Sequence, residues 1–224
     1  MEQRHILSLG AIDRARLTRE DIARALAAGP DPRGRSDAAV EAMLDGEPVP
    51  GLRLGGQAPP TPAAVLVPLF ERPDGMTVLL TQRTAHLANH PGQISFPGGR
   101  LDPGDCGDQI ACALRETEEE VGLAREHVTV LGQLDEYVTG TGFAVTPVVG
   151  VITPPVDLSP DSFEVAEIFE VPLEFLVDPA NHRLHRREVA GRSRPFWAMT
   201  WQDRLIWGAT AGILVNLSDI LGRP

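Results

Sequence analysis

The chain has 224 residues, 42% of them hydrophobic, with a formal net charge of −11 and a pI near 5.0. A chain this acidic is not expected to bind nucleic acid or an anionic membrane, because both kinds of binding rest on clusters of lysine and arginine. We find no signal peptide and no long apolar run, and two cysteines, Cys106 and Cys112, are too few for a disulfide framework, so a cytoplasmic protein is expected.

Residues 1–50 predict two short helices. Thr18 opens the first in a T-x-x-D capping arrangement with Asp21, and Gly29-Pro30 ends it. The second helix is expected from Ser36 to Asp45. Residues 51–61 belong to a stretch rich in proline and glycine, which predicts an extended connection. The expected organisation is a helical N-terminal extension (1–50), this connection (51–61) and one larger domain (62–221).

The larger domain mixes strands and helices. Residues 63–70 and 76–81 predict two paired strands around a Pro73-Asp74-Gly75 turn, and further strands are expected at 128–134, 145–152 and 197–201. One helix is expected between strands after residue 107, and another from about Arg204 to Leu221. This order predicts an α/β fold, an α/β/α sandwich with a mixed β-sheet.

The helix after residue 107 carries an unusual set of glutamates. At about 100° per residue, Glu116, Glu119 and Glu120 fall on one arc, while Glu118 points away from it. Nothing basic is expected one turn away on that arc to offset their repulsion. A hard divalent cation would offset it, because Mg²⁺ prefers oxygen ligands and is usually held by one or two carboxylates together with substrate phosphates.

A solvated acidic face is the alternative explanation of these glutamates. Two features count against it. Apolar residues recur on the opposite side of the helix, which predicts a stripe packed on a core: Ile110, Ala113, Leu114, Thr117 and Val121. Upstream, Pro97-Gly98-Gly99 permits the close backbone approach that an anion-binding turn needs. The sequence therefore predicts a fixed metal site for a phosphate ester or anhydride.

Residues 115–123 read R-E-T-E-E-E-V-G-L and resemble the second half of the Nudix box, which ends R-E-U-x-E-E-x-G-U with U a bulky aliphatic residue. Thr117 departs from that pattern. Gly99 lies 16 positions before Arg115, two more than in the family. Gly107 stands where the family has a glutamate, for which Asp105 or Asp108 can substitute.

The Nudix resemblance implies roles for the glutamates. Glu116 and Glu120 would bind Mg²⁺ or Mn²⁺, with Glu119 as a further ligand or the general base, and Arg115 would orient glutamates. Water would attack one phosphorus of a nucleoside diphosphate linked to another moiety. A glutamate from a distant loop is the other candidate for the base, and Glu164 and Glu167 are the loop residues concerned, unless both are solvated loop charges.

A second stretch is similar to the coenzyme A pyrophosphatase branch of that family, whose signature is L-L-T-x-R-[SA]-x3-R-x3-G-x3-F-P-G-G. Residues 79–84 read L-L-T-Q-R-T, and Gly92 and residues 96–99 complete the match. Thr84 replaces a serine or alanine. Ala88 replaces an arginine that would offer a planar fork to a phosphate, and His86 and His90 flank the gap. The residues implied to bind substrate are Arg83, Gly98, Gly99 and Arg100.

Three further segments leave alternatives open. Gly140 and Gly142 either close a turn or face the substrate. Trp207 either belongs to the buried stripe of the last helix or stacks on a base. His182 and His185 have a spacing that could suggest a metal pair, but no third ligand is nearby, so a basic solvated loop or strand is favoured, and it could still meet the substrate's anionic tail.

The sequence thus predicts a metal-dependent hydrolase that cleaves coenzyme A or acyl-CoA into a phosphopantetheine and adenosine 3′,5′-bisphosphate. Two alternatives are a Nudix pyrophosphatase for another nucleotide diphosphate compound, such as ADP-ribose or a dinucleotide, and a non-catalytic nucleotide-binding regulator. The expected partner is a small nucleotide, with a homodimer as a further expectation.

Overall fold

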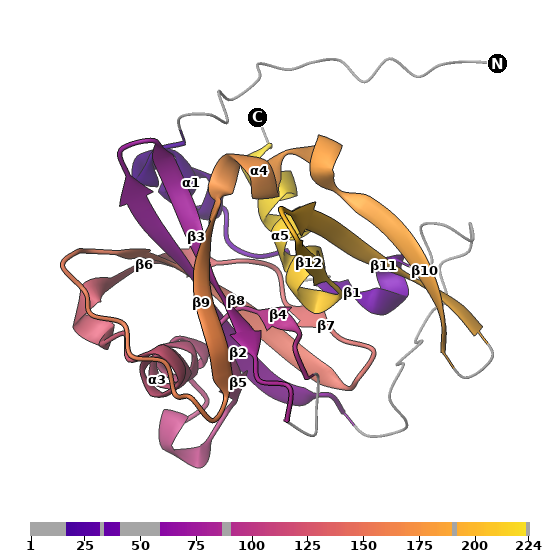
Figure 1. Ribbon diagram of the computed structural model, residues 1–224, viewed down its shortest axis with the longest axis horizontal. Coiled ribbons are helices and arrows are strands. Elements are labelled where there is room, and N and C mark those ends of the chain that lie inside the picture. Colours follow the sequence, from indigo (N-terminus) through magenta and orange to yellow (C-terminus); the bar gives the residue numbers. More distant parts are fainter. Residues whose placement is uncertain (1–16, 32–33, 41–58, 87–90, 190–191, 223–224) are drawn as a thin grey trace.

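The computed structural model describes residues 17–31, 34–40, 59–86, 91–189 and 192–222. Within these ranges nine strands form one mixed sheet and three form a second. Figure 1 shows α3 (Gln109–Val121) on one side of the central sheet, with α4 (Leu173–Val177) and α5 (Ala209–Leu221) on the other. The predicted α/β/α sandwich with a mixed sheet is therefore confirmed. No helix in the described ranges is both long and apolar enough to cross a membrane.

The centre of the main sheet consists of three long strands, β2 (Thr61–Arg72), β3 (Gly75–Arg83) and β8 (Phe143–Ile152). β2 and β3 form the predicted hairpin, with Arg72 opposite Gly75. β2 also runs parallel to β8 over ten paired positions, from Thr61↔Phe143 to Phe70↔Ile152. The parallel pair is possible because α3 and the shorter strands lie in the connection between them.

Shorter strands complete the central sheet. β4 (Ile94–Ser95) and β9 (Val165–Pro172) pair with β3, and β5 (Gly98–Arg100) pairs with β2. β6 (Val128–Gln133) and β7 (Tyr137–Val138) pair with β8, and β1 (Arg35–Ser36) pairs in parallel with β7. The predicted strands at 128–134 and 145–152 are thus present as β6 and β8.

Alternation along β2 divides the core into two layers. Leu66 and Phe70 point to the α3 side, where they pack with Cys112 and Ala113, whereas Val67 and Leu69 point to the larger cluster under α4 and α5. A strand buried on both faces reads as a continuous apolar run rather than an alternating one. This explains why residues 63–70 are almost entirely apolar.

The second sheet contains β10 (Arg183–Val189), β11 (Arg192–Trp201) and β12 (Arg204–Trp207). The predicted strand at 197–201 is the end of β11. The predicted helix from about Arg204 is wrong in its first turn: Arg204–Trp207 pairs with β11, and the helix begins only after Gly208. Met199 and Ile206 point into the core, whereas Leu205 is exposed. Burial that alternates between neighbouring residues is typical of a strand, and the helical prediction missed this alternation.

The N-terminal helix α1 (Arg19–Leu26) is capped as predicted. The Asp21 amide donates to Thr18 Oγ1 at 3.2 Å, and the Thr18 amide donates to the Asp21 carboxylate at 3.1 Å. Its apolar side completes the larger core layer, since Ile22 is fully buried and Leu26 is nearly so. Of the second predicted helix, Ser36–Asp45, residues 37–40 are helical and residues 41–45 lie outside the described ranges.

The described part of the predicted N-terminal extension is therefore packed against the core and paired with the central sheet. β1 joins the central sheet, and Arg35 pairs with Asp135 and with Asp219 on α5, at 3.3 and 2.7 Å. The residues of the predicted connection before Pro59 lie outside the described ranges, and β2 begins at Thr61. The domain limits 1–50, 51–61 and 62–221 remain a prediction.

This packing predicts that α1 contributes to global stability. Ile22→Ala removes a fully buried side chain and should lower the free energy of unfolding by about 2–5 kcal/mol, as measured by urea denaturation. Glu20→Ala, on the exposed side of the same helix, should change it by less than about 1 kcal/mol. Equal effects of the two substitutions would show that α1 does not unfold with the core.

Candidate metal and active site

The helix α3 presents the glutamates from a fixed position. Asp108 caps it, because its carboxylate accepts from the Ile110 and Ala111 amides at 2.8 and 3.3 Å, and Gly122 ends it. On the inner side Cys112, Ala113, Thr117 and Val121 are buried. The Thr117 hydroxyl donates to the Ala113 carbonyl at 2.6 Å. That bond satisfies the hydroxyl and explains how threonine fills the place of an aliphatic residue.

Arg115 joins three carboxylates. Its Nε and Nη2 donate to the two oxygens of Asp105 at 2.9 Å each, and its Nη1 donates to Glu116 and Glu119 at 2.9 and 3.0 Å. The expectation that nothing basic offsets the glutamates is therefore wrong, because Arg115 precedes Glu119 by one helical turn. This guanidinium holds the pKa of the Asp105 carboxyl well below its usual range. Of the two aspartates proposed for the missing box glutamate, Asp105 meets Arg115, while Asp108 serves as the helix cap.

Glu116 lies against the glycine strand β5. A Cβ atom added to Gly99 would lie 2.5 Å from the Glu116 carboxyl carbon, so only glycine leaves room for this carboxylate. Gly98 is equally constrained, since its φ is +151° and a Cβ there would lie 2.5 Å from Val65 Cα of β2. Burial raises the pKa of Glu116, although Arg115 opposes the shift.

Glu120 is the most deeply buried of the glutamates. Its side chain is 9% exposed, accepts from the Gly98 amide at 3.2 Å, and lies 3.9 Å from Nη1 of Arg83. Burial raises its pKa to about 7, and the nearby Glu164 and Glu116 add to that shift. One amide and one distant guanidinium do not compensate the charged form, which would be stabilised by a cation.

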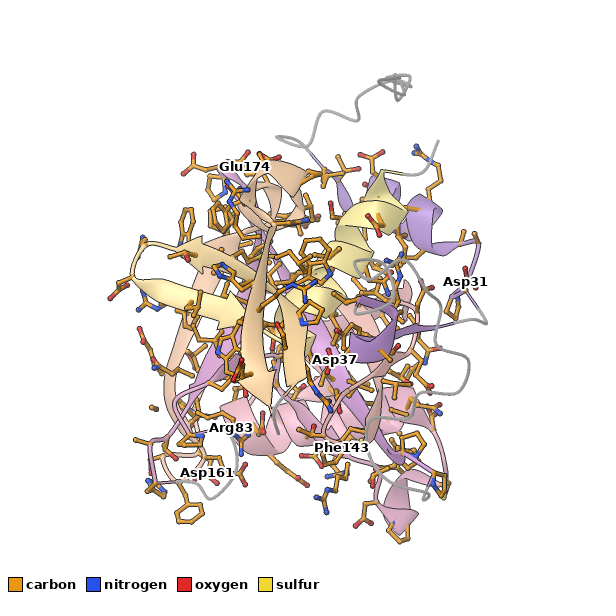
Figure 2. All side chains as sticks on the ribbon, turned by 90° about the vertical axis from the view of Figure 1, so that its right-hand side faces the viewer. Asp31, Asp37, Arg83, Phe143, Asp161 and Glu174 are labelled. Carbon is orange, nitrogen blue, oxygen red and sulfur yellow. The ribbon has the colours of Figure 1, made fainter. Side chains whose placement is uncertain are left out.

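The loop that leads into β9 brings Glu164 to the same place. Arg83 at the end of β3 lies 4.0 Å from the Glu164 carboxylate. Thr84 fastens this loop, because its amide donates to the Glu164 carbonyl at 2.9 Å and its hydroxyl to the Phe163 carbonyl at 2.8 Å. In Figure 2 the labelled Arg83 lies next to Asp161, which accepts from the Glu164 amide within this loop. The other loop candidate, Glu167, instead pairs with Arg204 at 2.6 Å.

Glu118 and Glu119 differ from the buried pair. Glu118 points away from the other glutamates and pairs with Arg125 at 3.1 Å. The side chain of Glu119 is 60% exposed, and Arg115 is its partner within the described part of the chain. Arg100, the remaining residue predicted to bind substrate, places its guanidinium 5.1 Å from the ring centre of Phe143.

The open alternatives at Gly140, Gly142, His182 and His185 can now be described. Residues 139–142 form a tight turn, in which the Gly142 amide donates to the Thr139 carbonyl at 3.1 Å. His182 bonds the Leu176 carbonyl, whereas His185 stacks on Phe196, so the two histidines serve different contacts. Ala88 and His90 lie outside the described residues, and His86 meets the ring of Phe163 edge-on.

The donor set suits a hard divalent cation. Within the described ranges no three histidine, cysteine, aspartate or glutamate side chains converge as a metal cluster, because Arg115 holds Glu116 and Glu119 while Glu120 turns to Gly98. Mg²⁺ does not need such a cluster, since one or two carboxylates and substrate phosphates are its usual ligands. Glu116 and Glu120 are two partly desolvated carboxylates on one helical face, and they fit that requirement.

A cavity of about 390 Å³ lies elsewhere in the molecule. It is lined by the turn between β2 and β3, the end of β9 and the start of α4, including Arg72, Glu170 and Glu174, and it contains none of the predicted site residues. The chemistry therefore points to the open surface beside α3 rather than to this cavity.

The sequence did not identify one long-range contact, that of Asp37. Its carboxylate accepts from the Tyr137 hydroxyl and from the Gly140 amide, both at 2.6 Å, and so ties the N-terminal segment to the 139–142 turn. The partners lie 100 and 103 positions apart in the chain. No local pattern in the sequence indicates this contact.

The chain is similar in sequence to several known proteins. Residues 60–190 match the model of the NUDIX domain. An "uncharacterized Nudix hydrolase NudL" from Enterobacter sp. (strain 638) is 40% identical over 160 residues, covering 71% of this chain and 82% of that protein. The protein of the same name from Photorhabdus laumondii is 41% identical over 172 residues, covering 73% and 91%. A solved structure of a C. elegans Ap4A hydrolase is 26% identical, covers 50% of this chain and 80% of that one, and has a TM-score of 0.42.

The close contact at Gly99 generates a prediction. Gly99→Ala should displace the Glu116 carboxylate without unfolding the protein, because the clash involves the far end of a flexible side chain. Mn²⁺ affinity, measured by isothermal titration calorimetry, should fall roughly 10–100-fold. Gly104→Ala is the matched control, since a Cβ there would meet only Asp102 at an ordinary 3.4 Å. An unchanged affinity in Gly99→Ala would mean that Glu116 does not hold the cation.

Proposed function

Because this chain belongs to the Nudix hydrolase family, we propose that it cleaves the pyrophosphate bond of coenzyme A or acyl-CoA, giving a phosphopantetheine or its acyl form and adenosine 3′,5′-bisphosphate. One observation carries the choice of substrate. Arg83, from the segment that resembles the coenzyme A pyrophosphatase signature, lies beside both Glu120 and Glu164. The signature segment and the glutamate helix therefore border one site.

We assign Glu116 and Glu120 to the binding of Mg²⁺ or Mn²⁺. When bound, such a cation neutralises charge that develops on the phosphoryl oxygens and favours the ionised form of a water ligand. Arg115 acts through the glutamates. Its two bonds to Asp105 fix the guanidinium, which in turn fixes Glu116 and Glu119.

The reaction needs a carboxylate that removes a proton from the attacking water. As that water bonds to one phosphorus, the bridging P–O bond breaks and the other phosphate leaves. Two residues can take the proton, Glu119 and Glu164, which are both more exposed than Glu120 and both close enough to Glu116 to influence its pKa. A general base must be accessible to the substrate, which Glu120 is not.

We assign Arg83, Gly98, Gly99 and Arg100 to substrate binding. Arg83 is only 26% exposed and faces the carboxylates, so it suits a phosphate of the pyrophosphate group. Arg100 follows the two glycines on β5 and extends over Phe143. These guanidinium groups provide local positive charge in an otherwise acidic protein.

One observation favours a second substrate class. Ala88 stands where the coenzyme A pyrophosphatase signature has an arginine, so a contact expected for that branch is missing from the sequence. A pyrophosphatase for ADP-ribose or a dinucleotide would not require it. A non-catalytic nucleotide-binding regulator is the remaining alternative, and the presence of Glu116, Glu119 and Glu120 together argues against it.

Neutralising Glu120 should separate metal binding from folding. Glu120→Gln should reduce kcat by orders of magnitude at saturating Mg²⁺, because an anionic ligand is lost. It should not lower the metal-free stability at pH 8. Burial raises the pKa of Glu120 to about 7. At pH 8 the side chain is therefore mainly charged, and the metal-free fold is less stable with the charged form than with a neutral one. Steady-state kinetics and urea denaturation measure the two effects.

Glu118→Gln provides the control on the same helix. Glu118 pairs with Arg125 on the other side of α3, so its neutralisation should leave kcat nearly unchanged. If Glu118→Gln were as damaging as Glu120→Gln, the assignment of ligands to α3 would be wrong.

A substrate panel tests the proposed activity directly. The purified protein with Mg²⁺ or Mn²⁺ should release adenosine 3′,5′-bisphosphate from coenzyme A and acetyl-CoA, identified by mass spectrometry. ADP-ribose and a diadenosine polyphosphate are the competing substrates. Cleavage of these two without cleavage of coenzyme A would show that the protein acts on the alternative substrate class. Binding without turnover of any compound would support a non-catalytic nucleotide-binding regulator.

A further inference from the structure

The second sheet carries a concentration of positive charge in a strongly acidic chain. Residues 182–194 contain five arginines and two histidines against one glutamate, a formal charge of +4, whereas the whole chain is −11. The proposed chemistry on α3 leaves this cluster unexplained.

The strand register places much of this charge on one face together with aromatic rings. His185 is opposite Phe196, Arg187 is opposite Arg194, and Trp207 is opposite Ala198. Cross-strand partners and alternate residues share a face. We call this the basic-aromatic face, and it consists of Arg183, His185, Arg187, Arg194, Phe196 and Trp207. Met199 and Ile206, on the other face, are buried in the core.

Aromatic contacts hold one guanidinium in place. The Arg187 guanidinium lies 5.0 Å from the ring centre of Trp207 and 5.9 Å from that of Phe196, and the two rings meet edge-on at 5.6 Å. His185 stacks on Phe196 at 5.8 Å. A stacked guanidinium keeps its N–H groups at its edge, where they match a phosphate group.

Arg187 and Arg194 differ from several other arginines in their contacts. Among the residues that the structure describes, neither Arg187 nor Arg194 forms an ion pair, and the buried Nε of Arg194 has no hydrogen-bond partner. Several other arginines of the domain contrast with them, as in the pairs Arg72–Glu170 and Arg115–Asp105. A pair of arginines left without acidic partners in an acidic protein is suited to an external anion.

The face adjoins the proposed active site through a short series of contacts. Gly208, which follows Trp207, borders the Gln93 side chain, and the Thr210 hydroxyl donates to the Ile94 carbonyl at 3.1 Å. The Gln93 carbonyl in turn accepts from the Arg83 amide at 3.0 Å. Figure 2 turns this side of the molecule, on which β10 and β11 lie in Figure 1, towards the viewer.

We propose that the basic-aromatic face binds a phosphate group on the nucleotide end of the substrate, remote from the pyrophosphate, with Arg187 and Arg194 as its ligands. This inference rests on the proposed function, in which that group is the 3′-phosphate of coenzyme A. It also accounts for Ala88. The arginine of the signature is missing at that position, and guanidinium groups from β10 and β11 would make the phosphate contact in its place.

The overall charge decides between a small anion and a polyanion. A nucleic acid would meet the field of the whole chain, which is −11, and its affinity depends on neutralising many phosphates at once. A single phosphate requires only a few local cations. The face is therefore matched to a mononucleotide that bears an additional phosphate.

Binding of product analogues to the metal-free full-length protein tests the inference independently of turnover. In calorimetry, adenosine 3′,5′-bisphosphate should bind about tenfold more tightly than adenosine 5′-monophosphate, a difference of about 1.4 kcal/mol. Arg187→Gln should abolish that preference, and Arg187→Lys should retain part of it. Arg24→Gln is the control, because it removes one exposed arginine from α1.

Each outcome bears on the face or on the proposed function separately. If coenzyme A is hydrolysed but Arg187→Gln and Arg194→Gln both keep the preference for the bisphosphate, the face is not the phosphate site, while the activity stands. If coenzyme A is not hydrolysed but the preference exists and Arg187→Gln abolishes it, the face stands and the substrate is another phosphorylated nucleotide. If Arg187→Gln alters only the oligomeric state in light scattering, the face is an interface between copies and the inference fails.

Discussion

Repulsion between like charges is the constraint on which the site depends. Three glutamates on one side of α3 destabilise the helix unless their charge is compensated. The fold compensates with the Arg115 guanidinium, the Gly98 amide and, at longer range, Arg83. The compensation remains incomplete at Glu120, whose burial favours its neutral form. A cation would stabilise the charged form of a carboxylate held in this state, and the buried inner side of the helix keeps the glutamates in position.

Features that depend on neighbouring residues could be predicted from the sequence. The α1 cap needs only Thr18 and Asp21, and the β2–β3 hairpin needs only the Pro73-Asp74-Gly75 turn between two apolar runs. The relative directions of Glu118 and Glu120 follow from helical geometry alone. The Nudix resemblance extended these local patterns to a family and a fold, because its motif is also contiguous in the sequence.

Features that depend on distant pairing could not be predicted. The first turn of the last helix was wrong because Arg204–Trp207 pairs with a strand that the sequence does not mark as its partner. The choice between Asp105 and Asp108 stayed open until the structure showed which one meets Arg115. Glu164 and Glu167 are equivalent in sequence, and their partners in the structure separate them: Glu164 lies near Arg83, whereas Glu167 pairs with Arg204. In each case a side chain's partner is set by how the sheets pack.

The N-terminal segment contacts parts of the chain that are synthesised last, and this affects when the fold can be completed. β1 pairs with β7, and Arg35 reaches Asp219, which is 184 positions further along. While the ribosome is still producing α5, the apolar side of α1 therefore has no complete surface to cover. Contacts between residues so far apart in the chain slow folding, and nascent protein is vulnerable to association during this delay. Because Arg35 contacts Asp219 on α5, this part of the fold can be completed only after the last helix has been synthesised.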